Sequence, residues 1–430
     1  MFESVVYCDT KHVIMRKFLM ESCEYDAVTS GGNKDYSKEK AKRFWRPFLR
    51  QLFVSSGVWS IYFVLGLGFG APTVMIPQIR REANSTDAVS ENMASWLSSV
   101  HGYSALPWVF IIPILTRYVG RKLPFLLVCL NTLVAFILFY FSTNNTHLLV
   151  SAIMLGMLLA SNMTLLVVIV TEYSSPRYRG IFMIFESALF FWGVWIANAT
   201  GAFSQWRNIG IIAFVCSLYP LTAVFWPESP YWLAMKGRFD ECAASHHWLK
   251  GFDKDAEYEL ETLISSQKAY LEMCAQRRNT VSRFRLKHIM EVVTTKAFYM
   301  PMFISISVMS MYHFSGKLVC SMYAIDLMKQ ITGSESTANV GMLIMDSVTI
   351  VGMQVGCISS KFLKRRTLLL SSATMGIIFL FTISIYLYLV KFSIISENKY
   401  LSILLLTLFS VSISVGPMIM PSTIFGELIS

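Results

Sequence analysis

Long apolar runs, separated by short polar connections, make up most of the chain. Each run has roughly 20 residues, which is the length that an α-helix needs to cross ~30 Å of hydrocarbon. The apolar positions are continuous rather than alternating, which argues against the strands of a β-barrel. We therefore predict an all-α polytopic membrane protein. The pattern places about ten spanning helices near 52–75, 94–115, 123–142, 147–170, 181–203, 208–226, 298–328, 338–358, 367–390 and 400–425.

A polar stretch after Trp226 separates six of these helices from the other four. It opens with Pro227 and Pro230, which stop a helix, and residues 253–277 then have the Glu, Leu, Ala and Gln content of an amphipathic helix. A solvated linker between two bundles is the preferred interpretation, and a regulatory domain is the alternative. The predicted parts are a cytoplasmic tail at 1–50, a six-helix bundle at 51–226, a cytoplasmic helical linker at 227–296 and a partial four-helix bundle at 297–430.

The distribution of charged residues indicates how the predicted helices are oriented in the membrane. The chain has 15% charged residues, against about 25% in soluble domains, and a formal net charge of +10. Lys and Arg gather in alternate connections, which predicts a cytoplasmic N-terminus and makes nucleic-acid binding unnecessary as an explanation. The first 50 residues contain no apolar signal segment. We expect a multi-pass protein of the plasma membrane, with glycosylation acceptors at Asn84 and Asn144 on outside loops.

No pattern typical of enzyme chemistry accompanies these helices. The eight cysteines are scattered without a Cys-x-x-Cys pair, so neither a metal site nor a disulfide framework is indicated. His246 and His247 are adjacent, so they diverge on a helix and do not chelate together. We find no nucleophile–base pair and no phosphate loop. The sequence therefore predicts a protein that is not an enzyme and that has no cofactor.

Four short motifs lie at predicted cytoplasmic helix ends. They are Gly120-Arg121-Lys122 after helix two, Glu-Tyr-Ser-Ser-Pro-Arg-Tyr-Arg-Gly at 172–180 after helix four, Pro-Glu-Ser-Pro-Tyr-Trp-Leu at 227–233 followed by Lys-Gly-Arg at 236–238, and Gly426-Glu427 at the end of helix ten. In this order they resemble the sugar porter branch of the major facilitator superfamily, and its insect facilitated trehalose or glucose transporter-like members in particular. The resemblance covers the chain from about residue 50 to its end.

The resemblance implies two six-helix halves that rock about a site near the membrane midplane, of which about ten of twelve helices are present here. It also implies that Arg–carboxylate pairs clasp the cytoplasmic side while the cavity opens outward, since such pairs are strong when partly desolvated. Anchoring of the chain by positive charge explains the basic residues but not the acids. The expected gating residues are Arg121, Glu172, Arg179, Glu228, Arg365, Arg366 and Glu427.

The chain departs from the family at the positions that contact sugar. Ser187 stands where the family has a glutamine, Tyr312 and His313 replace two further glutamines, and Ser422 replaces a tryptophan. Amide side chains supply paired donors and acceptors to vicinal hydroxyls, so their loss is expected to weaken hexose binding. The candidate substrate-binding residues are Ser187, Tyr312, His313, Lys317 and Ser422.

His313 and Lys317 are four residues apart, so a continuous helix would place them on one face. We hypothesise that they line a cavity for an anionic or polar non-hexose ligand, with Glu186 or Asp346 as internal counter-charge. In the alternative, Lys317 reaches toward the membrane surface and His313 is hydrogen-bonded within the bundle.

Two further features bear on proton coupling of transport and on the number of helices present. The first spanning helix, 52–79, has no acidic residue, which favours facilitated diffusion over proton symport, although Glu186 or His313 could act as a relay. The sequence stops at Ser430, where the family continues with two more helices, so we expect a fragment or a truncated product. The predicted function is alternating-access facilitated transport of a sugar or related small polar solute. The alternative is a transport-dead relative that acts as a membrane sensor or binding protein, or a non-functional fragment.

Overall fold

The computed structural model describes residues 34–84, 88–278, 294–317, 320, 329, 335–392 and 398–419, and within these ranges it contains helices and no strand. The chain divides into two units, 1–49 and 50–430, each of which is considered by itself. Eight of the described helices are long and apolar enough to cross a membrane, and two shorter apolar helices cover Phe298–Met311 and Tyr400–Val415. These segments overlap the ten predicted runs, which confirms the all-α polytopic fold.

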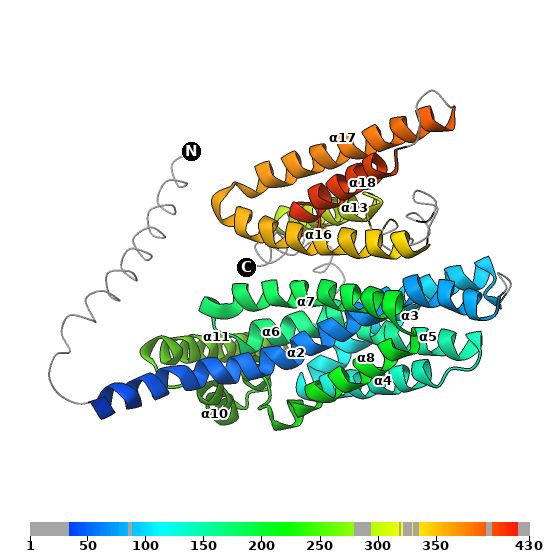
Figure 1. The fold of residues 1–430 in the computed structure, drawn as a ribbon. Helices are drawn as coiled ribbons and strands as arrows, with labels where there is room; N and C mark the ends of the chain where they lie inside the picture. Colours follow the sequence, from blue (N-terminus) through cyan, green and yellow to red (C-terminus); the bar gives the residue numbers. More distant parts are fainter. Residues whose placement is uncertain are drawn as a thin grey trace. The chain divides into compact units, whose positions relative to one another are not determined.

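The first half of the larger unit is a bundle of helices in which α2 packs against α7 (Figure 1). The helix α2 begins earlier than expected, at Lys34 within the predicted tail, because Lys, Glu, Ala and Arg continue a helix readily. The fourth predicted run contains a π-helical turn, η2. The elements are α2 (Lys34–Glu82), α3 (Glu91–Val119), α4 (Lys122–Tyr140), α5 (Asn145–Ser161), η2 (Asn162–Leu166), α6 (Val167–Tyr173), α7 (Pro176–Phe203), α8 (Arg207–Leu218) and η3 (Tyr219–Phe225).

Glycines allow α2 and α7 to touch along their backbones. A Cβ atom added at Gly66 would clash with the carbonyl oxygen of Phe190, and one added at Gly193 would clash with that of Phe63. One turn further along, a Cβ atom at Gly70 would lie 2.8 Å from the Cβ of Ala197. Small residues at matching positions are what membrane helices need for close packing. The glycines of the first spanning helix therefore serve its close packing against α7.

The described part of the second half contains α13 (Lys296–His313), α16 (Glu335–Phe362), α17 (Arg365–Lys391) and α18 (Lys399–Val415). The helices α16, α17 and α18 lie side by side (Figure 1). A Cβ atom at Gly352 of α16 would lie 3.2 Å from the Cβ of Ser414 on α18, so these two helices also approach closely. The helix α16 packs against α7 as well, and this contact joins the second half to the first.

The linker forms a small helical layer of α9 (Pro230–Met235), α10 (Phe239–Lys250) and α11 (Lys254–Arg278). Trp232, Cys242 and Leu260 are among the buried side chains of its own apolar core. The layer is fixed to the first half: Arg50 Nη1 donates to the carbonyl of Trp248 at 2.8 Å. The predicted amphipathic helix over 253–277 is confirmed as α11, whereas residues 279–293 of the predicted linker lie outside the described residues.

Candidate functional site

Arg121 and Glu172 form a bidentate ion pair at one end of the first half. Arg121 Nε donates to Glu172 Oε2 at 2.9 Å and Arg121 Nη2 donates to Oε1 at 2.8 Å. Gly120, which precedes the arginine, has a φ of 110°, a conformation that side chains resist. A Cβ atom there would also run into the carboxylate of Glu228. Glycine before Arg121 is therefore required by both the turn and the packing.

Glu228 closes the N-terminus of α4. Its Oε1 accepts the backbone N–H of Arg121 at 2.8 Å and that of Lys122 at 3.3 Å. These donors have no carbonyl partner within the helix, and a negative charge at this end interacts favourably with the helix dipole. Lys122 Nζ in turn donates to the carbonyl of Trp226 at 2.9 Å. The Pro-Glu-Ser-Pro stretch is thus tied to the Gly-Arg-Lys turn by charge and by backbone bonds.

These contacts brace the first half and its linker. Arg179 is hydrogen-bonded to the hydroxyl of Tyr231, and its buried Nε has no hydrogen-bond partner. On the second half, Arg366 is exposed, the side chain of Arg365 is not described and Glu427 lies outside the described residues. Arg121, Glu172 and Glu228 therefore lie together, whereas the clasp between the two halves remains a prediction.

The linker holds two buried basic residues beside this cluster. The pKa of His246 is lowered to about 4, mainly because the ring is buried and then because Lys250 and His247 lie nearby. Within the described residues, neither ring nitrogen of His246 has a hydrogen-bond partner. Burial also lowers the pKa of Lys250, and its contact with Glu259 partly offsets that effect. The layer therefore packs around a neutral imidazole next to a paired ammonium group.

A second polar cluster lies inside the second half around Lys317. The side chain is 2% exposed, and its ammonium group donates to Thr349 Oγ1 at 3.0 Å and to Ser410 Oγ. Asp346, one turn before Thr349 on α16, interacts electrostatically with the ammonium group. A buried ammonium group is tolerated when it has both an opposite charge and hydrogen-bond acceptors, and Lys317 has both.

Asp346 also connects the two halves. Asn198 Nδ2 of α7 donates to Asp346 Oδ2 of α16 at 2.6 Å, and both residues are buried. Next to this bond, Trp195 Nε1 donates to Ser347 Oγ at 2.8 Å. Asn198 lies 22 residues into α7, or about 33 Å of helix rise from Pro176. The junction of the halves is therefore far along α7 from the Arg121–Glu172 pair.

The predicted shared face of His313 and Lys317 is wrong. The helix α13 ends at His313, and the chain turns through Gly316, which has a φ of 77°. As a result His313 is exposed while Lys317 is buried. A four-residue spacing places side chains together only where the helix continues through both positions, and here a turn intervenes.

Of the remaining substrate-binding candidates, the structure describes only the side chain of Ser187. Ser187 is half-buried and donates to the carbonyl of Met183, one turn back on its own helix, at 3.4 Å. The side chain of Tyr312 is not described, and Ser422 lies outside the described residues. The sequence reading missed Asn198, whose polar side chain within an apolar run was the available signal.

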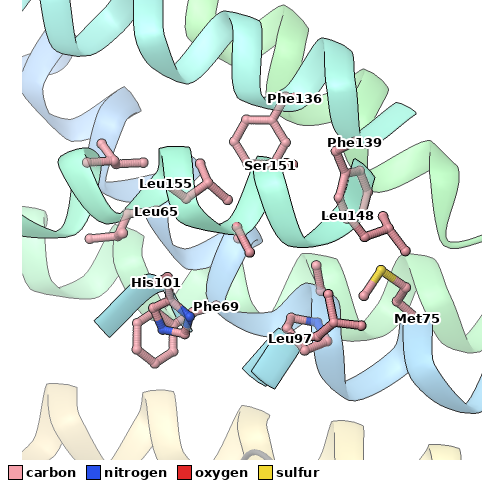
Figure 2. Close-up of a pocket in the computed structure, with 15 residues that line it drawn as sticks. Leu65, Phe69, Met75, Leu97, His101, Phe136, Phe139, Leu148, Ser151 and Leu155 are labelled. Carbon is pink, nitrogen blue, oxygen red and sulfur yellow. The ribbon is translucent and has the colours of Figure 1, made fainter. Parts of the chain in front are cut away.

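An apolar cavity lies within the first half, between α2, α3, α4 and α5 (Figure 2). Its volume is about 30 Å³, room for about two water molecules. His101 and Ser151 contribute polar side chains, but the Ser151 hydroxyl already donates to the carbonyl of Ala135. His101 packs edge-on against Phe69, with ring centroids 4.7 Å apart. The cavity is therefore a packing defect of the bundle and is too small for a sugar.

Apolar spanning helices in two halves, with buried polar side chains at their junction, define a polytopic membrane protein. The model of the family described as "Sugar (and other) transporter" matches residues 52–430, so the chain belongs to that family. This membership confirms the resemblance to sugar porters.

Curated relatives include a facilitated trehalose transporter of Apis mellifera ligustica, which is 24% identical over 394 residues, covering 91% of this chain and 76% of that protein. Another, from Bombyx mori, is 22% identical over 92% of this chain and 74% of its own length. A further relative, a facilitated trehalose transporter Tret1-2 homolog from Drosophila sechellia, is 25% identical over a match that covers 65% of this chain and 55% of that protein. Among solved structures, the xylose transporter XylE from E. coli in a partially occluded inward open conformation has a TM-score of 0.65 at 13% identity, with 88% of each chain covered.

Proposed function

We propose that this protein carries a sugar or a related small polar solute across a membrane by alternating access of its two halves. The family match over both halves is the observation that carries the proposal. Relatives named as trehalose transporters support a sugar-like solute, as does a fold shared with a xylose symporter bound to 6-bromo-6-deoxy-D-glucose. The proposal contains no catalytic step.

The solute site is proposed near the junction of α7 and α16. Lys317 and Asp346 balance each other's charge there, and the hydroxyls of Thr349 and Ser410 already bind the ammonium group. Solute hydroxyls can replace such hydroxyls at little cost because the same kinds of donor and acceptor are exchanged. The proposed solute-facing residues are Ser187, Tyr312, His313, Lys317 and Ser422.

Gating is proposed to use the charged helix ends. The Arg121–Glu172 pair and the Glu228 contacts make a rigid end to the first half, against which basic and acidic groups of the second half can close. Only a partly desolvated Arg–carboxylate pair is strong enough for such a role. The proposed gating residues are Arg121, Glu172, Arg179, Glu228, Arg365, Arg366 and Glu427.

We propose further that the protein resides in the plasma membrane with its N-terminus in the cytoplasm. Asn84 and Asn144 are exposed at the ends of α2 and α5, as glycan acceptors need to be. Asn145 Nδ2 donates to the carbonyl of Ala88 at 2.8 Å, so the two acceptor segments lie at the same end of the bundle. Loss of a glycosidase-sensitive mass shift in the Asn84→Gln and Asn144→Gln variants would locate that end outside the cell.

Uptake by purified protein in liposomes tests the function. We expect saturable entry of labelled trehalose or glucose, and acceleration of entry by unlabelled solute inside the vesicles, since a carrier exchanges solute faster than it returns empty. A panel of hexoses, disaccharides and polyols then identifies the solute class. If no member of the panel enters faster than it enters protein-free vesicles, the transport proposal is wrong.

A further inference from the structure

Glu186 of α7 is a buried carboxyl group inside the first half. It is 4% exposed, and it is hydrogen-bonded to the hydroxyl of Tyr62 on α2, which is 6% exposed. The Tyr62 hydroxyl also lies 3.5 Å from the carbonyl oxygen of Asn162. Asn162 opens the π-helical turn η2. Such turns widen a helix and recur at functional sites.

No positive charge balances Glu186 among the described residues. Its second carboxyl oxygen, Oε2, has no hydrogen-bond partner in the part of the chain that the structure describes. Tyr62 is the titratable group that faces it from α2, and η2 presents a neutral carbonyl. The charges on neighbouring elements are engaged elsewhere: Glu172 of α6 with Arg121, and Asp346 of α16 with Asn198.

Asp346 shows which partners accompany a buried carboxyl group elsewhere in this protein. It has an ammonium group nearby and an amide donor at 2.6 Å. Glu186 is equally buried and has neither. An isolated carboxylate in a low-dielectric interior is strongly disfavoured, and such a group takes up a proton instead.

The hydrogen-bond donors and acceptors around Tyr62 also indicate that Glu186 carries a proton. The Tyr62 hydroxyl has one hydrogen and faces two acceptors, the Glu186 carboxyl and the Asn162 carbonyl. If Glu186 is ionised, one of the two acceptors has no donor. If Glu186 carries a proton, its O–H donates to the Tyr62 oxygen, and the Tyr62 O–H donates to the Asn162 carbonyl. Each donor then has an acceptor along one chain of bonds from α7 through α2 to η2.

We propose that Glu186 is a proton-binding site of this carrier, that it holds a proton in the packing described here, and that the rate of solute transport depends on that proton. The carboxylate gains one proton from water and releases it again when the first half loosens. The inference goes beyond the proposed transport function, which does not require any proton. It places a carboxyl group beside the first spanning helix, whose segment 52–79 has no acidic residue of its own, because Tyr62 of that helix reaches the acid on α7.

Infrared difference spectroscopy of the purified full chain tests proton binding without any solute. We expect a carbonyl band of a protonated carboxylic acid at neutral pH, shifted in heavy water and absent from Glu186→Gln. The matched control Asp346→Asn removes the second buried carboxyl group of the described residues and should leave that band in place. A band missing from the parent protein, or unchanged in Glu186→Gln, would overturn the proposal.

Transport at several pH values provides a second measurement. We expect the initial uptake rate to fall about tenfold per pH unit once the medium is alkaline enough to remove the proton. Glu186→Gln imitates the protonated form and should stay active with a flat pH profile. A profile that keeps its slope in Glu186→Gln contradicts the proposal and leaves the transport function intact. Absence of uptake in all variants contradicts the transport function, and the infrared band then decides on the proton alone.

Discussion

Asn198 and Asp346 are joined by a 2.6 Å hydrogen bond between helices that belong to different halves of the protein. Asp346 also has the ammonium group of Lys317 nearby in its own half. A single carboxylate therefore serves both the internal charge balance of the second half and its contact with the first. Separation of the halves along α7 and α16 must break the bond to Asn198 while the interaction with Lys317 can persist.

Replacement of Lys317 tests this charge balance. Lys317→Met leaves Asp346 buried without its cation, which we expect to lower the free energy of unfolding by about 3–5 kcal/mol. The double variant Lys317→Met with Asp346→Asn removes both charges and should recover a large part of that loss. Thermal unfolding in detergent measures both, and Lys391→Met, at an exposed helix end, is the control. Equal losses in the single and double variants would show that the two charges are not coupled.

The close contact of α2 and α7 predicts opposite outcomes for two neighbouring glycines. Gly66→Ala pushes a methyl group into the Phe190 carbonyl and should destabilise the bundle by about 1–3 kcal/mol. At Gly68 the atoms nearest to an added Cβ are Leu155 Cδ1 at 3.2 Å and Phe136 Cζ at 3.6 Å, and both residues line the cavity. Gly68→Ala should therefore be neutral or stabilising by up to about 1 kcal/mol. Similar melting temperatures for the two variants would contradict the packing described here.

The ion pair of Arg121 and Glu172 should contribute far more than an exposed pair. Glu172→Gln removes a carboxylate that accepts two bonds from Arg121, and we expect a loss of about 1.5–3 kcal/mol. Glu241→Gln breaks the pair with Arg238, in which both side chains are at least half exposed, and should cost less than about 1 kcal/mol. Chemical unfolding of both variants makes the comparison, and equal effects would argue against a structural role for the motif.

Acid should loosen the linker layer through His246. Its pKa is about 4 in the folded chain against an ordinary 6.5, so the unfolded chain binds the extra proton first as the pH falls. The stability that comes from keeping His246 neutral is therefore fully present above pH 6.5 and is lost progressively toward pH 4. The loss in the free energy of unfolding is about 2 kcal/mol at pH 5. We expect the melting temperature to drop between pH 7.5 and pH 5, and to drop less in His246→Gln. The exposed His147 provides the control, since His147→Gln should keep the full drop.

The sequence predicted the class of fold because lipid imposes a simple requirement on it. A spanning segment must satisfy its own backbone hydrogen bonds and present an apolar surface, and both demands are visible in the ten apolar runs. The breaks between helices were also visible locally. The motif that starts at Gly120, and Pro227 and Pro230 at the start of the linker, mark helix ends through the residues next to them. The positions of Arg121, Glu172 and Glu228 at helix ends could be read as well, but their contacts could not.

Only the tertiary structure decided which buried charges have partners. Lys317, Asp346 and Asn198 come from three distant segments, and Glu186 meets Tyr62 across a gap of 124 residues that no local pattern spans. The face that a helix turns toward its neighbours is set by packing in lipid, where the helices associate through shape and hydrogen bonds rather than through a hydrophobic stripe. The turn at Gly316 also separated His313 from Lys317. A spacing of four residues indicates a shared helix face only when the backbone is helical through both positions.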